Sequence, residues 1–442
     1  MSTASIVKKN AYPGILFLAL PALIVLMPAL FIPLPPLLDY PNHLARLWLI
    51  CGGAATPPLD RFYAVDWHGI ATNIGIDLAA KAFCPIVPPL RLGRILLALA
   101  IVLPPLGAAL LNRAVFHRWS IWQTLFFFFW SSQTLLDGFL NFQIGLGMAL
   151  MAAALDQSWS PPPAVRFLIR LTIAVALIVI HPFALLFYFV LLAGLGFGPE
   201  PFDFRNDRTA LRLRLSAAIR RAAVCLIPVI VFFALPHVVP GGNAMDPIEF
   251  NGPISAILAL FTPFFSYNVF VDIVFLEALF ALAIIWATKK KIRIHGGLFA
   301  ASIGTAIAAL FMPCFCFNTY LTDQRLPLMA VMTGFSAICL TPSADRRETG
   351  WQTAGICSLV LLRTLWIGWN WSAGPAMVAS MQKALKDVPA GATLLTVKNY
   401  HLPPLGFAPL GRNLIYAGDT YRHYPAMAVV WRHAYVPTLV SQ

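Results

Sequence analysis

The side chains best suited to chemistry lie in one short stretch, Asp39-Tyr-Pro-Asn-His-Leu-Ala-Arg46, which holds a carboxylate, an amide, an imidazole and a guanidinium. Pro41 suits the first turn of a helix, because the N–H that proline lacks is one that this turn leaves unpaired. On such a helix Asp39 and His43 are four residues apart, as are Asn42 and Arg46, so their polar groups lie on neighbouring faces. The stretch is therefore either an amphipathic helix that anchors the chain at lipid headgroups or a catalytic or substrate-binding element.

The elements that must position this stretch are predicted from composition. Hydrophobic residues make up 59% of the 442 residues and charged residues 11%, whereas a soluble domain has about 25% charged residues. Apolar runs of about 20 residues recur along the chain, and each is long enough to cross a bilayer core about 30 Å thick. We therefore expect an all-α polytopic membrane protein with about eleven transmembrane helices, at residues 14–36, 92–112, 120–137, 139–156, 166–181, 183–199, 221–239, 269–288, 296–317, 324–342 and 351–371.

The formal net charge of +13 is explained by membrane topology rather than by nucleic-acid binding. With the N-terminus in the cytoplasm, most of the basic residues fall in the predicted inner segments, as the positive-inside rule requires. The odd number of spans then places the C-terminal segment outside. The segments 120–156 and 166–199 leave an alternative open, because their short apolar runs could form re-entrant or broken helices.

The first outer loop, 37–91, collects acidic side chains and so places any chemistry at the outer face. The loop holds Asp66 in an aromatic stretch and Asp77 in a second predicted helix, 73–83. Asn73 and Asp77 are four residues apart and would share a face of that helix, where they either bind a ligand or only cap and solvate the helix.

Polar side chains also occur within or beside later spans. Asn141 lies at membrane depth beside Gly145 and Gly147, which permit close helix packing, so Asn141 either finds a packing partner or lines a cavity. His181 precedes Pro182 near the outer end of a span, where it is either an interfacial hydrogen-bonding residue or part of a site.

Two arginines lie at or within predicted spans. Arg325 follows Asp323 at an outer junction. Its fork of donors matches the oxygens of a lipid phosphate, and the alternative is a local pair with Asp323. Arg363 lies inside the last span and must pair or snorkel to the interface, and the sequence does not name its partner.

The character of the chain changes after the last span. Residues 376–387 predict a short helix, and residues 391–398 follow a Pro-Ala-Gly turn and predict a strand. We therefore divide the chain into a transmembrane bundle, 1–372, and a small α+β extracytoplasmic segment, 373–442, that packs on the outer ends of the spans.

Cysteine usage and motifs exclude several kinds of site. The seven cysteines show no metal-ligand spacing, and we infer no disulfide framework from them. The sequence has no motif of a known nucleophile, no phosphate-binding glycine loop and no zinc motif. It also has no inverted repeat with paired broken helices, which argues against a secondary transporter.

A first span followed at once by an outer-loop Asp on a short juxtamembrane helix resembles the integral-membrane glycosyltransferases of the GT-C superfamily. A long two-helix first loop, an Arg-bearing outer connection late in the bundle and a small extracytoplasmic C-terminal segment extend the likeness over the whole topology. The motif Asp39-Tyr-Pro-Asn-His43-Leu is similar to the acidic first-loop motif of bacterial lipid A aminoarabinose-transferase-like and mannosyltransferase-like members. Many members carry a second acid after the first. Here Tyr40 takes that place, and Asp66 or Asp77 could supply the other carboxylate.

The resemblance implies transfer of a sugar from a polyprenyl-phosphate donor to a glycan or lipid acceptor, at the outer (periplasmic) face of a bacterial inner membrane. Asp39 would be the general base, and Arg325, or else Arg46 or His43, would stabilise the leaving phosphate. No cofactor is expected, and a divalent metal on the carboxylates has no supporting ligand spacing. The predicted substrate-binding residues are Asn42, His43, Arg46, Asp66, Asn73, Asp77, Asn141, His181, Asp323 and Arg325.

Two other classes of protein stay open. A transporter or flippase of a lipid-linked or small polar solute would use the same groups for binding without chemistry, and a non-catalytic subunit of an envelope complex would use them for assembly. The concentration of polar groups on one side favours the enzyme, since a carrier needs access from both faces. Membrane lipids are expected partners in every case, and nucleic acid in none.

Overall fold

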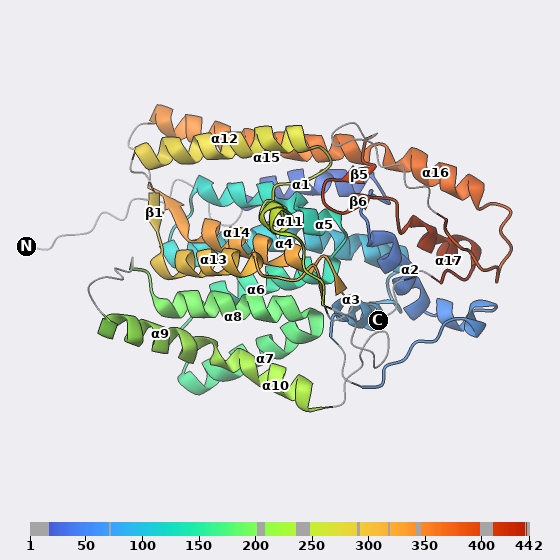
Figure 1. Ribbon diagram of the computed structural model, residues 1–442, viewed down its shortest axis with the longest axis horizontal. Coiled ribbons are helices and arrows are strands. Elements are labelled where there is room, and N and C mark those ends of the chain that lie inside the picture. Colours follow the sequence, from blue (N-terminus) through green and yellow to red (C-terminus); the bar gives the residue numbers. More distant parts are fainter. Residues whose placement is uncertain are drawn as a thin grey trace, which may run out of the picture.

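The computed structural model describes residues 17–69, 72–200, 208–235, 248–289, 292–316, 319–341, 346–397, 410–437 and 439. Its long helices run side by side along the long axis of the molecule (Figure 1). One end, called the α2 end below, carries α2 (Tyr40–Ile50), α3 (Gly75–Phe83) and α17 (Met427–Arg432). The opposite end, called the β1 end, carries β1 (Ile292–Ile294), which pairs antiparallel with β4 (Ile338–Leu340).

The bundle contains helices of membrane-spanning length and composition. Four meet both criteria among the described residues: α4 (Pro89–Phe116), α7 (Pro163–Ile180), α12 (Val269–Thr288), and the continuous run of α9 (Arg208–Ala222), η5 (Ala223–Cys225) and α10 (Leu226–Ala234). Shorter apolar helices accompany them: α1 (Ala19–Phe31), α8 (Pro182–Phe197) and α13 (Gly296–Ala309). The remaining long elements are α6 (Leu140–Ser158), α14 (Arg325–Ser336) and α15 (Arg346–Trp371). The predicted class, a helical membrane protein, is thereby confirmed.

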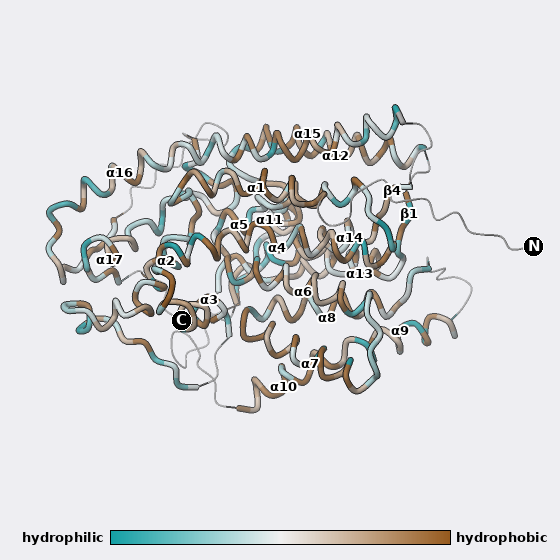
Figure 2. The backbone as a smooth tube through the Cα atoms, turned by 180° about the vertical axis from the view of Figure 1, so that it is seen from behind, coloured by the Kyte–Doolittle hydropathy of each residue, from teal (hydrophilic) through white to brown (hydrophobic). Residues whose placement is uncertain are grey.

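Hydropathy differs between the long helices and the C-terminal segment. Figure 2 shows hydrophobic residues along α7, α10 and α12 and hydrophilic ones along α16 (Gly374–Ala384). Many large apolar side chains of α10 and α12 are exposed, among them Ile230, Phe233 and Phe270. Such faces are stable only against lipid or another apolar surface.

The predicted span at 120–137 is not an α-helix. Ile121–Ser131 form a 3₁₀-helix, η4, and Gln133–Leu136 form the single turn α5; every residue of both is buried. Ser120 and Gln123 close a capping box at the start of η4. A 3₁₀-helix rises about 2.0 Å per residue, so η4 is about 22 Å long and crosses much of the bundle with few residues. The alternative of a broken element in 120–156 is therefore correct for its first half.

Close packing of α6 is confirmed. A Cβ on Gly147 would lie 2.4 Å from the Cβ of Leu103 on α4, and one on Gly145 would lie 2.6 Å from the Cβ of Ala184 on α8. The two glycines therefore allow three helix backbones to approach closely.

The first predicted outer loop forms two helices, as expected, with two differences. Helix α3 begins at Gly75, and Asn73 precedes it with a positive φ of 62°, so the shared helical face of Asn73 and Asp77 was wrong. Helix α2 is largely buried rather than lying on a surface. The reason is that apolar residues of the C-terminal segment, including Val429, pack with Leu49 and other residues of this loop in one cluster.

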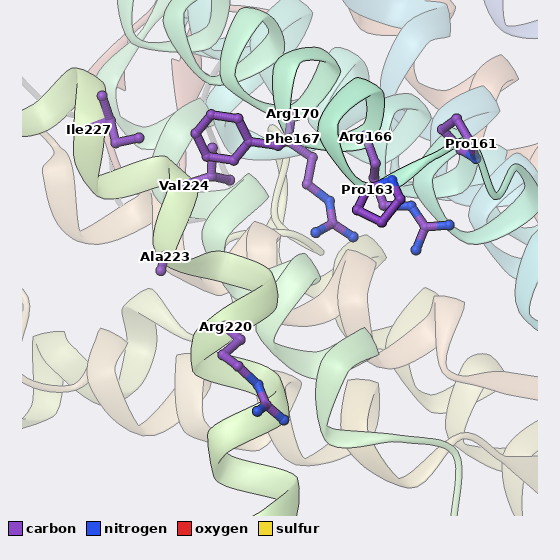
Figure 3. Close-up of a pocket in the computed structure, with 9 residues that line it drawn as sticks. All are labelled: Pro161, Pro163, Arg166, Phe167, Arg170, Arg220, Ala223, Val224 and Ile227. Atoms are coloured by element: carbon purple, nitrogen blue, oxygen red, sulfur yellow. The ribbon is translucent and has the colours of Figure 1, made fainter.

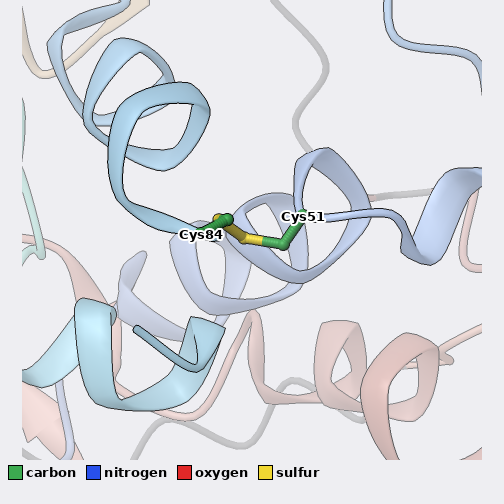
Figure 4. The surroundings of a disulfide bond; sticks show 2 residues. All are labelled: Cys51 and Cys84. Carbon is green, nitrogen blue, oxygen red and sulfur yellow. A yellow bond between two sulfur atoms is a disulfide. The ribbon is translucent and has the colours of Figure 1, made fainter. Parts of the chain in front are cut away.

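A disulfide joins the ends of these two helices, where the sequence predicted no disulfide framework. Cys51 follows α2, Cys84 follows α3, and they are bonded across a separation of 33 residues (Figure 4). Spacing could not reveal this pair, because the two cysteines meet only after α2 and α3 have packed together.

The C-terminal segment is an α+β cap with less strand than predicted. Helix α16 agrees with the predicted helix at 376–387. The predicted strand at 391–398 is reduced to one bridge between Thr393 and Tyr435, and Lys398 lies outside the described residues. Within the segment β5 (Asn413–Leu414) pairs with β6 (Gly418–Asp419), and an equally short pair, β2 (Phe315–Cys316) with β3 (Thr319–Tyr320), lies before α14. Pairs this short add little cohesion, so packing on α2 holds the segment.

Candidate functional site

Asp39 is held at the α2 end by backbone pairing with a segment about 100 residues later. Its N–H donates to the carbonyl of Asp137 at 3.0 Å, and the N–H of Leu38 donates to the carbonyl of Leu136 at 3.0 Å. Gly138 has a φ of 83°, and a Cβ there would lie 2.7 Å from the nitrogen of Asp39. Only glycine fits this close approach, and the result is that two carboxyl-bearing residues, Asp39 and Asp137, lie side by side.

The Asp39 carboxylate contacts an imidazole from the far end of the chain. Its Oδ1 is hydrogen-bonded to Nδ1 of His423 and also accepts a 3.4 Å hydrogen bond from Nδ2 of Asn42. The Asp39 and His423 side chains are each 24% exposed, so a molecule at the surface can reach both. With Asp39 ionised, His423 must donate from Nδ1, and Oδ2 of Asp39 stays open to accept a proton.

Arg325 is buried within electrostatic range of Asp39 and has no ion-pair partner among the described residues. The residue is 3% exposed, and its Nη1 donates to the carbonyls of Tyr320 and Leu321 at 3.3 and 3.0 Å. Its guanidinium lies 4.6 and 5.3 Å from the ring centroids of Phe139 and Phe183. Nε has no hydrogen-bond partner, and no described carboxylate lies within ion-pairing distance. The predicted local pair with Asp323 does not form.

Three carboxyl groups surround Arg325 at longer range. Asp39, Asp137 and Asp323 all interact electrostatically with its charge. In the described part of the chain, the buried Oδ2 of Asp137 and Oδ1 of Asp323 lack hydrogen-bond partners, as does the side-chain amide of Gln324. Native proteins pair nearly all buried polar atoms, so this group of unpaired atoms is suited to a polar ligand.

Asp323 is fixed by the C-terminal segment rather than by its neighbour in sequence. Its Oδ2 accepts hydrogen bonds from Tyr416 Oη at 2.6 Å and Asn251 Nδ2 at 2.7 Å. Burial raises the pKa of Asp323, while these two donors lower it. Tyr416 therefore joins the C-terminal segment to the connection that carries Arg325.

Arg46 and His43, the other two residues predicted to stabilise the leaving phosphate, are less suited to that role. Arg46 makes a bidentate ion pair with Asp77, from Nε to Oδ1 at 2.6 Å and from Nη2 to Oδ2 at 2.5 Å. This pair links α2 to α3. Burial lowers the pKa of His43, although Asp39 raises it, so the imidazole is neutral near pH 7. Arg325 is left as the better candidate.

Asn73 and Asn141 hold one another instead of facing open space. Nδ2 of Asn141 donates to the backbone carbonyl of Asn73 at 2.6 Å and to its Oδ1 at 3.1 Å, and Oδ1 of Asn141 accepts from the N–H of Ile76 at 2.8 Å. Asn141 therefore docks the start of α3 on α6. Of the two alternatives predicted for Asn141, a packing partner or a place in a cavity wall, the packing partner is correct.

Asp66 lies apart from the reacting groups, whereas His181 is within electrostatic range of Arg325. His181 is buried, and its Nδ1 accepts the N–H of Phe183 at 3.1 Å, which caps α8. Asp66 is 72% exposed and is paired only with the adjacent His68 in the described part of the chain. Hydrogen bonds from the backbone and ring of His68 lower the pKa of Asp66.

Arg363, whose partner the sequence did not name, is paired with Asp272 of α12. The two side chains are each 1% exposed. Nε of Arg363 also donates to Ser131 Oγ at 3.0 Å, and Nη2 donates to the carbonyl of Phe264 at 3.0 Å. This arginine is therefore structural.

Sequence reasoning missed four members of the site: Asp137, Asn251, Tyr416 and His423. Asp137 carried a signal, because it precedes a glycine in a polar connection between two apolar runs. His423 carried none, since nothing local links it to Asp39. Within the described residues, no group of three His, Cys, Asp or Glu side chains is placed to hold a metal ion.

Comparison of the chain with models of protein families, with curated proteins and with solved structures finds no match.

Proposed function

We propose that the chain is a membrane glycosyltransferase of the GT-C type, which transfers a sugar from a polyprenyl-phosphate donor to a hydroxyl of an envelope glycan or lipid. One juxtaposition carries the proposal: Arg325, a buried cation with no carboxylate partner among the described residues, lies within electrostatic range of Asp39, which is partly exposed and paired with His423. A base and an unneutralised cation are the two charges that transfer from a lipid phosphate requires.

The reaction is a displacement at the anomeric carbon. The acceptor oxygen forms a bond to this carbon as the bond from the carbon to the phosphate oxygen breaks. The acceptor proton passes to Oδ2 of Asp39, and the electron pair of the broken bond stays on the polyprenyl phosphate. Arg325, with Nε unpaired, stabilises the added negative charge. His423 and Asn42 act as positioning residues, because both hold Oδ1 of Asp39.

We propose eleven membrane passes with the α2 end outside. These passes are α1, α4, η4 with α5, α6, α7, α8, α9 with α10, α12, α13, α14 and α15. The Cys51–Cys84 disulfide supports this orientation, since disulfides persist in oxidising compartments. The many arginines toward the β1 end support it also, by the positive-inside rule. A bacterial inner membrane with a cytoplasmic N-terminus and a periplasmic C-terminus fits both.

The decisive experiment compares Asp39→Asn with Asp66→Asn in membranes matched for protein level. Asp39→Asn keeps the size and removes the base, so we expect turnover of polyprenyl-phosphate hexoses or pentoses to fall about 10²- to 10⁴-fold. Asp66→Asn is the matched control, because Asp66 is an exposed acid of the same predicted loop. Retained turnover in Asp39→Asn would overturn the assignment of the base.

His423→Gln separates positioning from catalysis. We expect a smaller loss of turnover than in Asp39→Asn, because the side-chain amide of glutamine can still donate a hydrogen bond to Asp39. Donor binding without turnover in the wild type, across the panel of donors, would favour the transporter or flippase. Neither binding nor turnover would favour the non-catalytic subunit.

A further inference from the structure

A second polar region lies far from Asp39, toward the β1 end, and the proposed transferase reaction does not use it. A cavity of about 480 Å³ opens between the start of α7 and the junction of α9 with α10. Its polar side is made by Arg166, Arg170 and Arg220, and its apolar side by prolines and by Phe167, Val224 and Ile227. Figure 3 shows the side chains of Arg166 and Arg170 leaving α7, with Arg220 across the gap on α9.

The charges around this cavity do not balance. Asp156 of α6 is bound by Arg170, at 2.6 and 3.0 Å, and by Arg221, at 2.9 and 2.6 Å. One carboxylate thus serves two guanidinium groups, and Arg166 lies close enough to repel the charge of Arg221. Among the described residues no other carboxylate makes an ion pair with these arginines, so the site keeps an excess of positive charge.

Arg166 and Arg220 are the two arginines left to bind a ligand. Nε of Arg166 is buried and has no hydrogen-bond partner among the residues that the structure describes. Arg220 is exposed and has no hydrogen bond or ion pair within the described part of the chain. A guanidinium presents a planar fork of donors that matches phosphate oxygens.

The surroundings favour a lipid over a free ion. Phe167 and Ile227 lie on helices of spanning length, α7 and α9 with α10, and are exposed there at 47% and 37%. Trp159, which is 50% exposed, lines the adjoining small cavity with Arg166. An amphipathic ring at a helix end is typical of the headgroup level of a bilayer, and basic pockets between helices there bind anionic headgroups.

We propose that this cavity binds the phosphate headgroup of an anionic phospholipid, with the acyl chains along Phe167 and Ile227. Arg166 and Arg220 bind the phosphate, and Arg170 stays on Asp156 and adds charge. The inference does not rest on the transferase activity, and it holds for either orientation of the protein in the membrane.

The test uses delipidated full-length protein in detergent and native mass spectrometry with added phosphatidylglycerol, phosphatidylcholine or sodium phosphate. We expect phosphatidylglycerol to bind best and Arg166→Gln/Arg220→Gln to weaken it about 30-fold, which equals about 2 kcal/mol. The matched control is Arg208→Gln/Arg212→Gln, which removes the same charge from the exposed start of α9, and should leave binding unchanged.

A third variant keeps every charge and fills the space. Ala223→Phe places a ring in the cavity that Ala223 lines, so it should exclude the lipid while the arginines remain. This variant also covers the case in which the double variant fails to fold. Equal losses in the double variant and its control, equal binding of phosphatidylcholine, or binding of free phosphate in place of the lipid would each overturn the proposal.

Discussion

Two arginines are fully enclosed near the α2 end, and their surroundings differ. Arg363 faces Asp272 and donates further hydrogen bonds to Ser131 and to backbone carbonyls. Both guanidinium groups lie over two aromatic rings. Arg325 differs in that it donates only to two carbonyls, leaves Nε unpaired and has no ion pair among the described residues. Burying an uncompensated charge is costly. Arg363, which is paired, therefore stabilises the helix packing, whereas the burial of Arg325 indicates a role other than stability.

The difference teaches how to separate structure from function in an apolar chain. Both residues are arginines in predicted spans, and the sequence left open whether Arg325 pairs with Asp323 and did not name a partner for Arg363. A satisfied pair needs no ligand, whereas an unsatisfied cation beside a reachable carboxylate and imidazole is suited to an anionic group that arrives from outside.

The largest effect is expected from Arg363→Met. The substitution leaves Asp272 buried with no charge partner, and this should lower the free energy of unfolding by about 3–5 kcal/mol. Chemical unfolding in detergent micelles measures it. The double variant Arg363→Met/Asp272→Leu removes both charges and should recover most of the loss. A double variant as unstable as the single one would show that Asp272 is not the partner that matters.

Arg325→Met should give the opposite pattern. It removes a charge that makes no ion pair with any described carboxylate, so we expect the free energy of unfolding to change by less than about 1 kcal/mol. Binding of polyprenyl phosphate should weaken about 10- to 100-fold, because a hydrogen bond to a charged group is worth about 1.5–3 kcal/mol. Lipid binding by native mass spectrometry and unfolding of the same samples measure the two quantities. Instability comparable to that of Arg363→Met would remove the distinction between the two arginines.

A smaller effect is expected from Asp77→Asn, which weakens the link between α2 and α3. The Arg46–Asp77 pair is partly exposed, with side chains at 21% and 5%, so its loss should cost about 1–2 kcal/mol. The Cys51–Cys84 disulfide also joins the two helices. The decrease in the free energy of unfolding should therefore be about twice as large once this disulfide is reduced. Unfolding with and without reductant measures this, and Asp60→Asn, at an exposed position, is the control. Equal loss in both variants would contradict a specific role for the pair.

The smallest effect is expected from Asp66→Asn. Asp66 is 72% exposed and touches only His68 among the described residues, so stability should stay within about 0.5 kcal/mol of the wild type. Turnover should also be unchanged, in contrast with Asp39→Asn. A clear loss of turnover would show that Asp66 supplies the second carboxylate that Tyr40 replaces.

Local pattern was enough for some of the fold and the site. The start of α2 at Tyr40–Pro41 and the close packing of Gly147 follow from the chemistry of proline and glycine at single positions. Length and apolar composition identified the long helices. Length and composition wrongly predicted a regular spanning helix at 120–137. An aromatic-rich run suits a buried 3₁₀-helix as well as an α-helix of the same hydropathy.

The sequence by itself determined that the chain is a helical membrane protein and that Asp39 stands where an apolar run ends. Both follow from the hydrophobicity of individual side chains, which does not depend on where the residues lie in the fold. Only the tertiary structure decided which polar groups meet: His423 with Asp39, Tyr416 with Asp323, and Cys51 with Cys84. These contacts join residues far apart in the chain, so their energies depend on packing of the whole bundle, which no local pattern encodes.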